Sequence, residues 1–472
     1  MKNNPLNPPL LRGNFSGTIH VGLIGFGTVG TGMATVLMEQ EKLIARRLGA
    51  NLVLTQIADV DIKRSRGINI KKISLTTNPY EIILNPKIDI IVELIGGIEP
   101  ACKFILDAIS HGKHIVTANK ALLATHGEKI FKAAEEAGVE ILFEGAVGGG
   151  IPIIRVMKEG LSADKITAIF GIVNGTSNYI LTKMSEEGSG FSKVLKEAQS
   201  LGYAEADPTL DVGGGDSAHK LAILALLAFG TPIPVKDIFT EGIDKVAPMD
   251  IAFAEAFGYK MKLLAIAKQV KGKLEARVHP TMIPKDEILA KVNGVFNAVC
   301  VVGKSVGETL FYGRGAGSIP TGSAVVSDLI SIARNILNQQ GYGKPHRVPV
   351  PPTGIISSAR LPLPIKPMAE IESRYYLRFM VEDRPGVLSA ISGVLGRHHI
   401  SIASVIQQGR KEAGAVPLVM MTHKAREKDI QMALEKINQS DSVYKPTVLI
   451  RVEGKDIDQF LPFKGRLGGD GI

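Results

Sequence analysis

The residues from Glu205 to Lys220, EADPTLDVGGGDSAHK, combine acidic side chains with a lysine and a run of three glycines. The ionisable members of this stretch are Glu205, Asp207, Asp211, Asp216 and Lys220. A lysine beside carboxylates is suited to proton transfer and to holding a charged ligand. Considered alone, the stretch is equally typical of a solvated acidic loop with an ion pair spaced four residues apart.

A loop and the helix after it must position these side chains. The apolar run LAILALLAF that follows Lys220 predicts the helix, with Asp216 as its N-cap. Lys220 then lies one turn further along, on the same face as Asp216.

The composition indicates an ordinary globular protein. The chain has 472 residues, 45% hydrophobic and 21% charged, enough for about two to four domains. Its net charge of +9 favours acidic or phosphorylated ligands, but no basic run is interleaved with aromatic residues, so we expect no nucleic-acid partner. No apolar stretch approaches the roughly 18 residues of a membrane span, and no secretion signal is evident. We expect a cytoplasmic protein with no membrane partner, in which Cys102 and Cys300 are reduced.

An apolar run from Ile19 to Ile24 predicts a buried parallel strand that leads directly into the sequence GFGTVG. A G-x-G-x-x-G pattern between a strand and a helix is typical of dinucleotide binding. Its glycines permit a tight turn, the close approach of a pyrophosphate and helix packing, while the helix N-terminus donates to the phosphates. We predict coenzyme contacts at Gly25, Phe26, Gly27, Thr28, Val29 and Gly30.

The second predicted strand, Leu52 to Ala58, ends at Asp59, whose carboxylate suits a ribose hydroxyl. Asp59 follows Gly30 by 29 residues, against a usual spacing of about 20, and one long helix containing LMEQEKLIARRLGA is expected to absorb the difference. Three basic residues follow and either accept a 2′-phosphate or form a solvated loop: Lys63, Arg64 and Arg66. The choice between NAD and NADP stays open.

Alternating strands and helices continue, and the strands at 88–94 and 114–116 end in ELIGG and TANK. Because the carboxyl ends of parallel strands border the ligand crevice, Lys120 is placed where chemistry would occur. The alternative is a surface lysine that starts a helix.

Two glycine-rich segments follow. EGAVGGGIP at 144–152 either turns backbone carbonyls toward a ligand or a hard cation, or forms a flexible connection. GRGAGSIPT at 313–321 opens a long helix and is either a phosphate contact or a compact turn. Between them we predict a strand at 165–173, a turn and cap at 174–176, a helix from Ile251 to Lys268, and strands at 274–280 and 295–302.

Together these segments resemble homoserine dehydrogenase. The matching sequences are GFGTVG at 25–30, ELIGG at 93–97, TANK at 117–120, EGAVGGGIP at 144–152, NGTSNYI at 174–180, EADPTLDVGGGDSAHK at 205–220 and GRGAGSIPT at 313–321. The resemblance implies interconversion of L-homoserine and L-aspartate 4-semialdehyde with NADP or NAD. It also leads us to expect the monofunctional form, since no aspartokinase-like segment precedes the first strand.

The resemblance implies roles for individual residues. Lys220 is implied as the proton donor and acceptor, and Lys120 as a second essential lysine near nicotinamide and substrate. The implied substrate-binding residues are Glu205, Asp216, Asp211, Gly175 and Thr176. Further implied coenzyme contacts are Ile95, Gly96, Lys120 and Gly315. A sodium ion is implied on the backbone carbonyls of Glu144, Val147, Gly149 and Ile151.

A proline-rich segment at 344–367 is followed by a predicted βαββαβ pattern. This unit resembles an ACT domain, whose DRPGVL turn implies a regulatory amino-acid site at Asp383, Pro385, Gly386 and Val387. L-threonine is the expected effector, and a dimerisation module without a ligand is the alternative.

The predicted fold class is α/β: a Rossmann-type nucleotide-binding domain, an α+β substrate and dimerisation domain, and a C-terminal βαββαβ ferredoxin-like ACT domain. We place the dinucleotide-binding domain at 1–138 plus 313–343, the substrate-binding domain at 139–312, the linker at 344–371, the ACT domain at 372–455 and the tail at 456–472. We expect a homodimer or homotetramer. Two other functions remain open: another NAD(P)-dependent amino-acid semialdehyde dehydrogenase or reductase, and a non-enzymatic amino-acid sensor.

Overall fold

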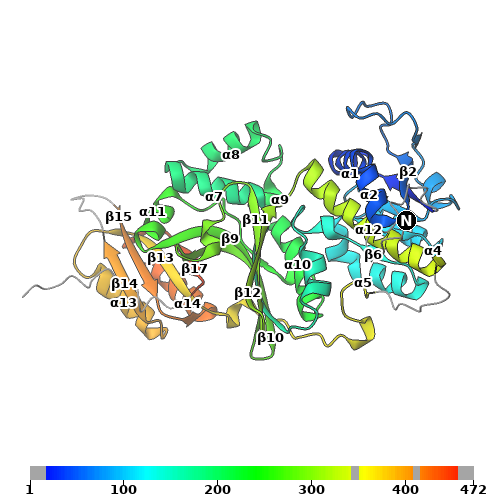
Figure 1. Cartoon of the computed structure of the whole chain (residues 1–472). Helices are drawn as coiled ribbons and strands as arrows, with labels where there is room; N and C mark the ends of the chain where they lie inside the picture. Colours follow the sequence, from blue (N-terminus) through cyan, green and yellow to red (C-terminus); the bar gives the residue numbers. More distant parts are fainter. Residues whose placement is uncertain (1–16, 342–349, 408–414, 455–472) are drawn as a thin grey trace, which may run out of the picture. The chain divides into compact units, whose positions relative to one another are not determined.

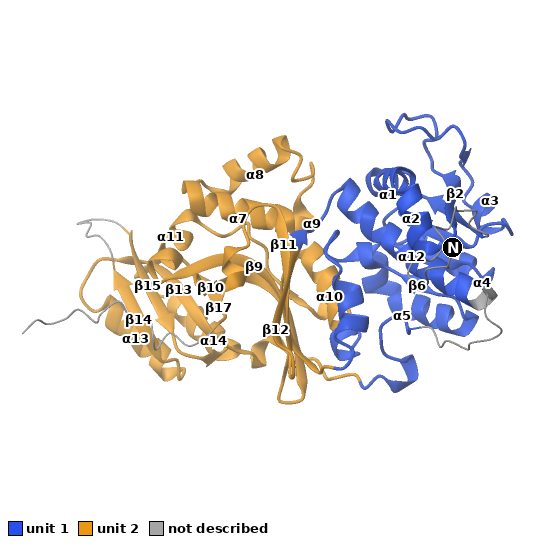
Figure 2. Cartoon of the chain, viewed as in Figure 1, with its two compact units in different colours: residues 1–163, 226–232, 313–361 blue, residues 164–225, 233–312, 362–472 orange. Residues whose placement is uncertain are grey.

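The computed structural model describes residues 17–341, 350–407 and 415–454. The chain (Figure 1) divides into two compact units, which Figure 2 shows in different colours. The first comprises residues 1–163, 226–232 and 313–361, and the second comprises residues 164–225, 233–312 and 362–472. The predicted tail at 456–472 and residues 344–349 of the predicted linker lie outside the described residues.

The first unit is built on a parallel sheet with the strand order β3-β2-β1-β4-β5-β6. This is the order of a dinucleotide-binding Rossmann fold, in which the direction of winding reverses beside β1. The inner strands are apolar because helices cover both faces of such a sheet, and Val21, Leu23 and Ile90 are fully buried. The strands are β1 (Thr18–Ile24), β2 (Asn51–Ala58), β3 (Ser74–Thr76), β4 (Ile90–Glu93), β5 (His114–Thr117) and β6 (Ile141–Leu142).

The single long helix expected after the glycine turn is instead two helices, α1 (Thr28–Glu39) and α2 (Glu41–Leu48). They meet at Gln40, whose φ of −100° and ψ of 12° lie outside the helical region. The break allows Ile44 of α2 to join the same core as α1. The other helices of this unit are α3 (Tyr80–Ile83), α4 (Ala101–Ser110), α5 (Lys120–Ala137), α6 (Ile153–Arg155) and α12 (Ser318–Gly341), the last of which packs against α1.

The second unit is built on one continuous sheet with the order β12-β11-β7-β9-β10-β17-β13-β15-β14. Its first five strands are β7 (Ile166–Ile172), β9 (Tyr259–Val270), β10 (Lys273–Pro284), β11 (Phe296–Gly303) and β12 (Gly307–Arg314), and the short β8 (Phe239–Thr240) pairs with β10. Its helices before the C-terminal module are α7 (Gly175–Glu187), α8 (Phe191–Ser200), α9 (Thr209–Val212), α10 (Gly215–Phe229) and α11 (Pro248–Ala256).

The predicted helix from Ile251 to Lys268 is wrong. The helix α11 ends at Ala256, Gly258 turns the chain with a φ of 83°, and the strand β9 begins at Tyr259. β9 pairs in antiparallel register with the whole of β10. Pairing with a neighbouring strand therefore outweighs the helix propensity of the alanines, leucines and lysines in this segment.

The C-terminal residues form the predicted βαββαβ unit around a core of their own. Its elements are β13 (Glu372–Glu382), α13 (Val387–Arg397), β14 (Ile402–Gln407), β15 (Ala415–Thr422), the short β16 (Ala425–Arg426), α14 (Glu427–Asn438) and β17 (Val443–Val452), and Figure 1 shows α13 and α14 packed together on this sheet. β17 also pairs in parallel with β10, with Thr281 opposite Arg451. The predicted fold class is confirmed. In the described parts of the chain, no helix is both long enough and apolar enough to cross a membrane.

Candidate active site

Lys220 lies in the second turn of α10, in the second unit. Its Nζ donates to Asp216 Oδ2 at 2.7 Å and to the carbonyl of Val173, directly after β7, at 2.6 Å. Lys220 is 7% exposed and Asp216 is 3% exposed. Buried, charge-assisted hydrogen bonds of this kind hold both partners in one geometry. The ammonium group is thus fixed beside the end of β7.

The helix α10 starts at Gly215, one residue earlier than the predicted N-cap. Asp216 is therefore in the first helical turn, and its carboxylate accepts from the side chains of Asn174 and Lys220. Gly214 makes the turn between α9 and α10 with a φ of 86°. A Cβ at Gly214 would lie 2.9 Å from Thr240 Cγ2, so this turn packs tightly against the sheet.

Asn174 connects the two aspartates of the site. Its Nδ2 donates to Asp211 Oδ1 at 2.7 Å and to Asp216 Oδ2 at 2.9 Å, while its Oδ1 caps α7 by accepting from Ser177 N at 2.8 Å. Sequence reasoning recognised the cap but missed the bridge. The sequence contains little signal for this bridge, because the two aspartates follow Asn174 by 37 and 42 residues.

The remaining predicted substrate residues lie in the same unit but make other contacts. Gly175 is the first residue of α7, and Thr176 Oγ1 donates to the Tyr203 carbonyl at 2.6 Å. The side chain of Glu205 is exposed, and no described hydrogen bond joins it to the aspartates or to Lys220. Asp207 accepts from Thr209 Oγ1 and N, which lowers the pKa of Asp207 and holds its side chain beside the first residue of α9.

The glycine turn after β1 has the shape that a dinucleotide requires. Gly25 has a φ of 100°, and a Cβ there would lie 2.6 Å from the carbonyl carbon of Leu94. A Cβ at Gly30 would lie 2.2 Å from Gly25 O, whereas a Cβ at Gly27 would meet no atom within 4 Å. Open space therefore lies over Gly27 at the N-terminus of α1, which has no side-chain cap and includes Thr28 and Val29. This cradle fits a pyrophosphate.

Asp59 closes the other side of this turn. Its Oδ2 accepts from Phe26 N at 2.6 Å, and its Oδ1 accepts from Arg66 Nη2 at 3.1 Å. The Arg66 guanidinium also stacks over the Phe26 ring at 5.1 Å and donates to the Phe26 carbonyl. Most of its donors are thus used within the protein, whereas Lys63 and Arg64 are exposed.

A second network organises the strand ends that carry Ile95, Gly96 and Lys120. Glu93 is fully buried and accepts from Ile95 N, Gly96 N and the Thr117 hydroxyl. Burial raises the pKa of Glu93.

Asn119 continues this network. It donates to the Gly97 carbonyl at 2.7 Å and caps α5 through Leu122 N, which places Lys120 at the first position of the helix. Both motifs were recognised in the sequence, but the bonds that hold them together were not predicted.

The second glycine turn is anchored through Glu144. The carboxylate accepts from Ile154 N at 2.8 Å and Arg155 N at 2.9 Å, and the backbone N–H donates to Asp328 Oδ2 at 2.7 Å. Burial raises the pKa of Glu144, and burial together with the Glu144 charge raises the pKa of Asp328 to about 7.

Val147, Gly149 and Ile151 lie in this turn, and backbone carbonyl oxygens are the kind of donor that suits a hard cation. Gly148 and Gly149 have φ values of 73° and 54°, and a Cβ at Gly149 would lie 2.7 Å from the carbonyl of Gly315. Gly315 therefore packs against this turn. Among the described residues no group of three or more His, Cys, Asp or Glu side chains forms a metal site.

The predicted regulatory turn lies between β13 and α13. Gly386 is the N-cap of α13 with a φ of 93°, and Val387 is the buried first residue of the helix. Asp383 accepts from Gln407 Nε2 at 3.4 Å, and Pro385 lies between these positions.

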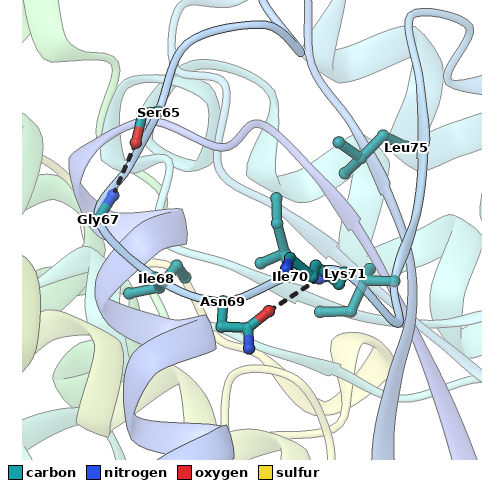
Figure 3. Close-up of a pocket in the computed structure, with 8 residues that line it drawn as sticks. Ser65, Gly67, Ile68, Asn69, Ile70, Lys71 and Leu75 are labelled. Atoms are coloured by element: carbon teal, nitrogen blue, oxygen red, sulfur yellow. Dashed lines mark hydrogen bonds between the residues drawn. The ribbon is translucent and has the colours of Figure 1, made fainter.

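A hollow of about 510 Å³ lies in the loop after Asp59, and neither Lys120 nor Lys220 is among its lining residues. Figure 3 shows its lining, in which Asn69 bonds to Lys71 N and Ser65 bonds to Gly67 N. Its other lining residues are Ile68, Ile70, Ile73 and Leu75. Apart from Lys71 the lining has no ionisable side chain, so we assign no chemistry to it.

Three family models match the chain in order. They are "Homoserine dehydrogenase, NAD binding domain" at residues 25–144, "Homoserine dehydrogenase" at residues 152–330 and "ACT domain" at residues 375–441.

Known proteins resemble the chain over most of its length. A homoserine dehydrogenase from Neisseria gonorrhoeae is 45% identical over 435 residues, which cover 92% of this chain and 98% of that protein. The crystal structure of a homoserine dehydrogenase from Thiobacillus denitrificans matches with a TM-score of 0.86 and 45% identity, covering 92% of this chain and 98% of that one. A hyperthermophilic archaeal homoserine dehydrogenase, solved in complex with NADPH, matches with a TM-score of 0.58 and 30% identity over 67% of this chain and 98% of that one. With the dinucleotide turn and the Lys220 site, these matches establish that the chain belongs to the homoserine dehydrogenase family.

Proposed function

We propose that this oxidoreductase, which acts on a CH–OH group, interconverts L-homoserine and L-aspartate 4-semialdehyde with Lys220 as the acid and base. The observation that supports this most directly is the buried contact of Lys220 with Asp216 and the Val173 carbonyl. The nicotinamide coenzyme supplies or accepts the hydride at the substrate carbon. Lys220 donates a proton to the substrate oxygen during reduction and takes it back during oxidation.

The substrate carries an ammonium and a carboxylate, so its site needs both signs of charge. We propose that Asp211 and Asp216, held by Asn174, face the ammonium together with Glu205. The N-terminus of α7, at Gly175 and Thr176, provides the positive end of a helix dipole for the carboxylate. Lys120, fixed by the cap of α5, is the second essential lysine of the proposal.

For the coenzyme we propose NADP, with NAD as the alternative. The space over Gly27 fits the pyrophosphate, and the exposed Lys63 and Arg64 lie next to the Asp59–Arg66 pair, where a 2′-phosphate would find positive charge. The archaeal relative with bound NADPH supports the same choice. We expect the Lys63→Ala/Arg64→Ala double variant to raise KM for NADP more than KM for NAD. Equal effects on both coenzymes would remove the support for NADP.

We further propose a sodium ion on the carbonyls of Glu144, Val147, Gly149 and Ile151. The support is the tight glycine backbone of this turn and its anchoring through Glu144 and Asp328. Thermal unfolding in sodium and in tetramethylammonium chloride at equal ionic strength tests the proposal, because a specific site raises Tm only in sodium.

The proposed effector is L-threonine, bound at the turn of Asp383, Pro385, Gly386 and Val387 in a homodimer or homotetramer. We propose that the signal reaches the proposed substrate residues through contacts within the second unit. Arg451 of β17 bonds to Glu427 and, at 2.8 Å, to Glu241. Two residues beyond Glu241, the N–H of Ile243 donates to the Val212 carbonyl in the α9–α10 turn at 2.8 Å. Measuring inhibition by millimolar threonine tests the effector. Light scattering tests the oligomeric state.

The reaction is tested by identifying its product. The purified chain is incubated with L-homoserine and NADP, and the aldehyde is trapped with a hydrazine and analysed by mass spectrometry. L-serine in place of homoserine is the control, since it has the same groups on a shorter chain. The proposal predicts the aspartate semialdehyde adduct from homoserine only, and a different aldehyde or none would refute it.

A further inference from the structure

Asn297 is a buried amide whose polar atoms have no described partner. The residue is 1% exposed, and within residues 17–341, 350–407 and 415–454 neither its Oδ1 nor its Nδ2 makes a hydrogen bond. Buried side-chain amides are nearly always paired, because burial without a partner is costly. An unpaired amide at this depth has a donor and an acceptor available for a ligand.

The register of the sheet places Asn297 beside the Lys220 site. β11 pairs with β7 in antiparallel fashion, with Ala298 opposite Ile172. Because the strands are antiparallel, one residue before Ala298 lies opposite one residue after Ile172. Asn297 is therefore opposite Val173, whose carbonyl accepts from Lys220.

The side chain also lies on the face of the sheet that carries the α9–α10 turn. Directly opposed residues of antiparallel strands share a face, and alternate residues along a strand share it too. Asn297 is thus on the same face as Val299. Val299 lies opposite Gly171, Gly171 lies opposite Ala265 and Ala265 lies opposite Val278, so Val278 is also on this face. A Cβ at Gly214 would lie 3.2 Å from Val278 Cγ1, so Gly214 packs on that face.

The amide lies next to the start of α7. A Cβ at Gly175 would lie 3.7 Å from Asn297 Oδ1 and 2.8 Å from the carbonyl of Val295. Gly175 is the first residue of a 13-residue helix, whose dipole favours an anion near its N-terminus. The helix start and the unpaired amide therefore converge on one place.

We infer that Asn297 binds the amino-acid end of the substrate, donating from Nδ2 to its carboxylate and accepting at Oδ1 from its ammonium. This rests on the proposed function and adds a specificity residue to it. An α-amino acid presents an acceptor and a donor on one carbon, and a carboxamide presents the complementary pair. The role is positioning and selection, while Lys220 moves the proton.

The test compares Asn297→Ala and Asn297→Asp with Val299→Ala, a buried apolar residue on the same strand and face. Each is assayed with L-homoserine and with 3-amino-1-propanol, which keeps the amine and hydroxyl but lacks the carboxylate. We expect Asn297→Ala to raise KM for homoserine by about ten-fold or more, the usual loss for a hydrogen bond to a charged group. KM for the coenzyme stays unchanged, and the preference for homoserine over 3-amino-1-propanol shrinks.

Asn297→Asp keeps the size of the side chain, so it remains informative if the alanine variant fails to fold. Its negative charge repels the substrate carboxylate, and we expect a larger rise in KM for homoserine than for 3-amino-1-propanol. Val299→Ala lowers Tm but leaves both KM values unchanged. Wild-type KM and wild-type preference in a folded Asn297 variant would overturn the inference. Absence of homoserine turnover in the wild type would instead refute the proposed function.

Discussion

At the scale of single residues, the account depends on Lys220. Its buried ammonium donates to a carboxylate and to a carbonyl, whereas most of the other lysines that the structure describes are exposed or half-buried. We expect Lys220→Ala to lower kcat by roughly 10²–10⁴-fold, the usual contribution of an acid–base group. Coenzyme binding, measured by nicotinamide fluorescence, should persist.

Lys183→Ala is the matched control for this variant. Lys183 also forms an ion pair four residues along a helix, with Glu187 at 2.8 Å, but 30% of its side chain is exposed. Its loss should leave kcat unchanged, because exposed pairs contribute little. A Lys220→Ala variant that turns over normally, or that no longer binds coenzyme, would contradict the assignment.

Two of the three glycines of the nucleotide turn, Gly27 and Gly30, distinguish an effect on coenzyme binding from an effect on stability. Gly27→Ala places its methyl group in open space, so the protein should keep its Tm while Kd for the coenzyme rises by roughly ten-fold or more. Gly30→Ala pushes against Gly25 O, and we expect a destabilisation of roughly 1–3 kcal/mol. Calorimetry and fluorescence titration measure the two effects. Tight coenzyme binding by Gly27→Ala would show that the pyrophosphate lies elsewhere.

Asp328 predicts a pH dependence of stability. Its pKa is raised to about 7 beside Glu144, whereas an aspartate in an unfolded chain titrates near ~4. Between these values the folded state holds a proton that the unfolded state releases, so Asp328 lowers stability as pH rises, with the full cost above pH 7. Asp328→Asn removes this titration. We expect its Tm to fall less than that of the wild type from pH 5 to 8, and parallel Tm profiles would contradict the shift.

At the scale of elements, local signals predicted some structures and not others. The run from Ile19 to Gly30 contains strong local signals, because apolar residues are followed within a few positions by glycines and the start of a helix. The strand β1 and the helix α1 form there. The strand β9 carries no such signal. It is a strand because it pairs with β10, and the local sequence pattern does not predict such pairing.

In the candidate site, too, local spacing predicted some contacts and not others. The residue types at Asp216 and Lys220 predicted their contact, because helix geometry sets a spacing of four residues. The bridge through Asn174 and the unpaired amide of Asn297 depend on which strands and helices become neighbours. Those residues lie far apart in the sequence, so only the fold reveals them.

The contacts that connect β17 with the proposed substrate residues give a prediction at this scale. Glu241 is 36% exposed at its side chain, and its pair with Arg451 contributes at most ~1 kcal/mol. Glu241→Gln should therefore raise the threonine concentration for half inhibition by up to about five-fold while kcat stays unchanged. Arg451 keeps its bonds to Glu427 in this variant. Threonine inhibition equal to that of the wild type would exclude this route.

At the scale of the whole molecule, the family models match the nucleotide-binding, substrate and ACT regions in turn. The sequence predicted this order of modules. It did not predict that the ACT strands continue the substrate sheet through β10 and β17. The reason is that Thr281 and Arg451, which face each other in that pairing, are separated by most of two modules in the sequence.

The proposed function requires that this chain oxidises homoserine with a nicotinamide coenzyme. Its most direct test is the initial rate of coenzyme reduction by the purified wild-type chain, with L-homoserine present or absent and with NADP and NAD in separate reactions. We expect coenzyme reduction that requires homoserine, saturates as the homoserine concentration rises and is faster with NADP than with NAD. A folded protein that binds coenzyme but reduces neither NADP nor NAD at any homoserine concentration would contradict it.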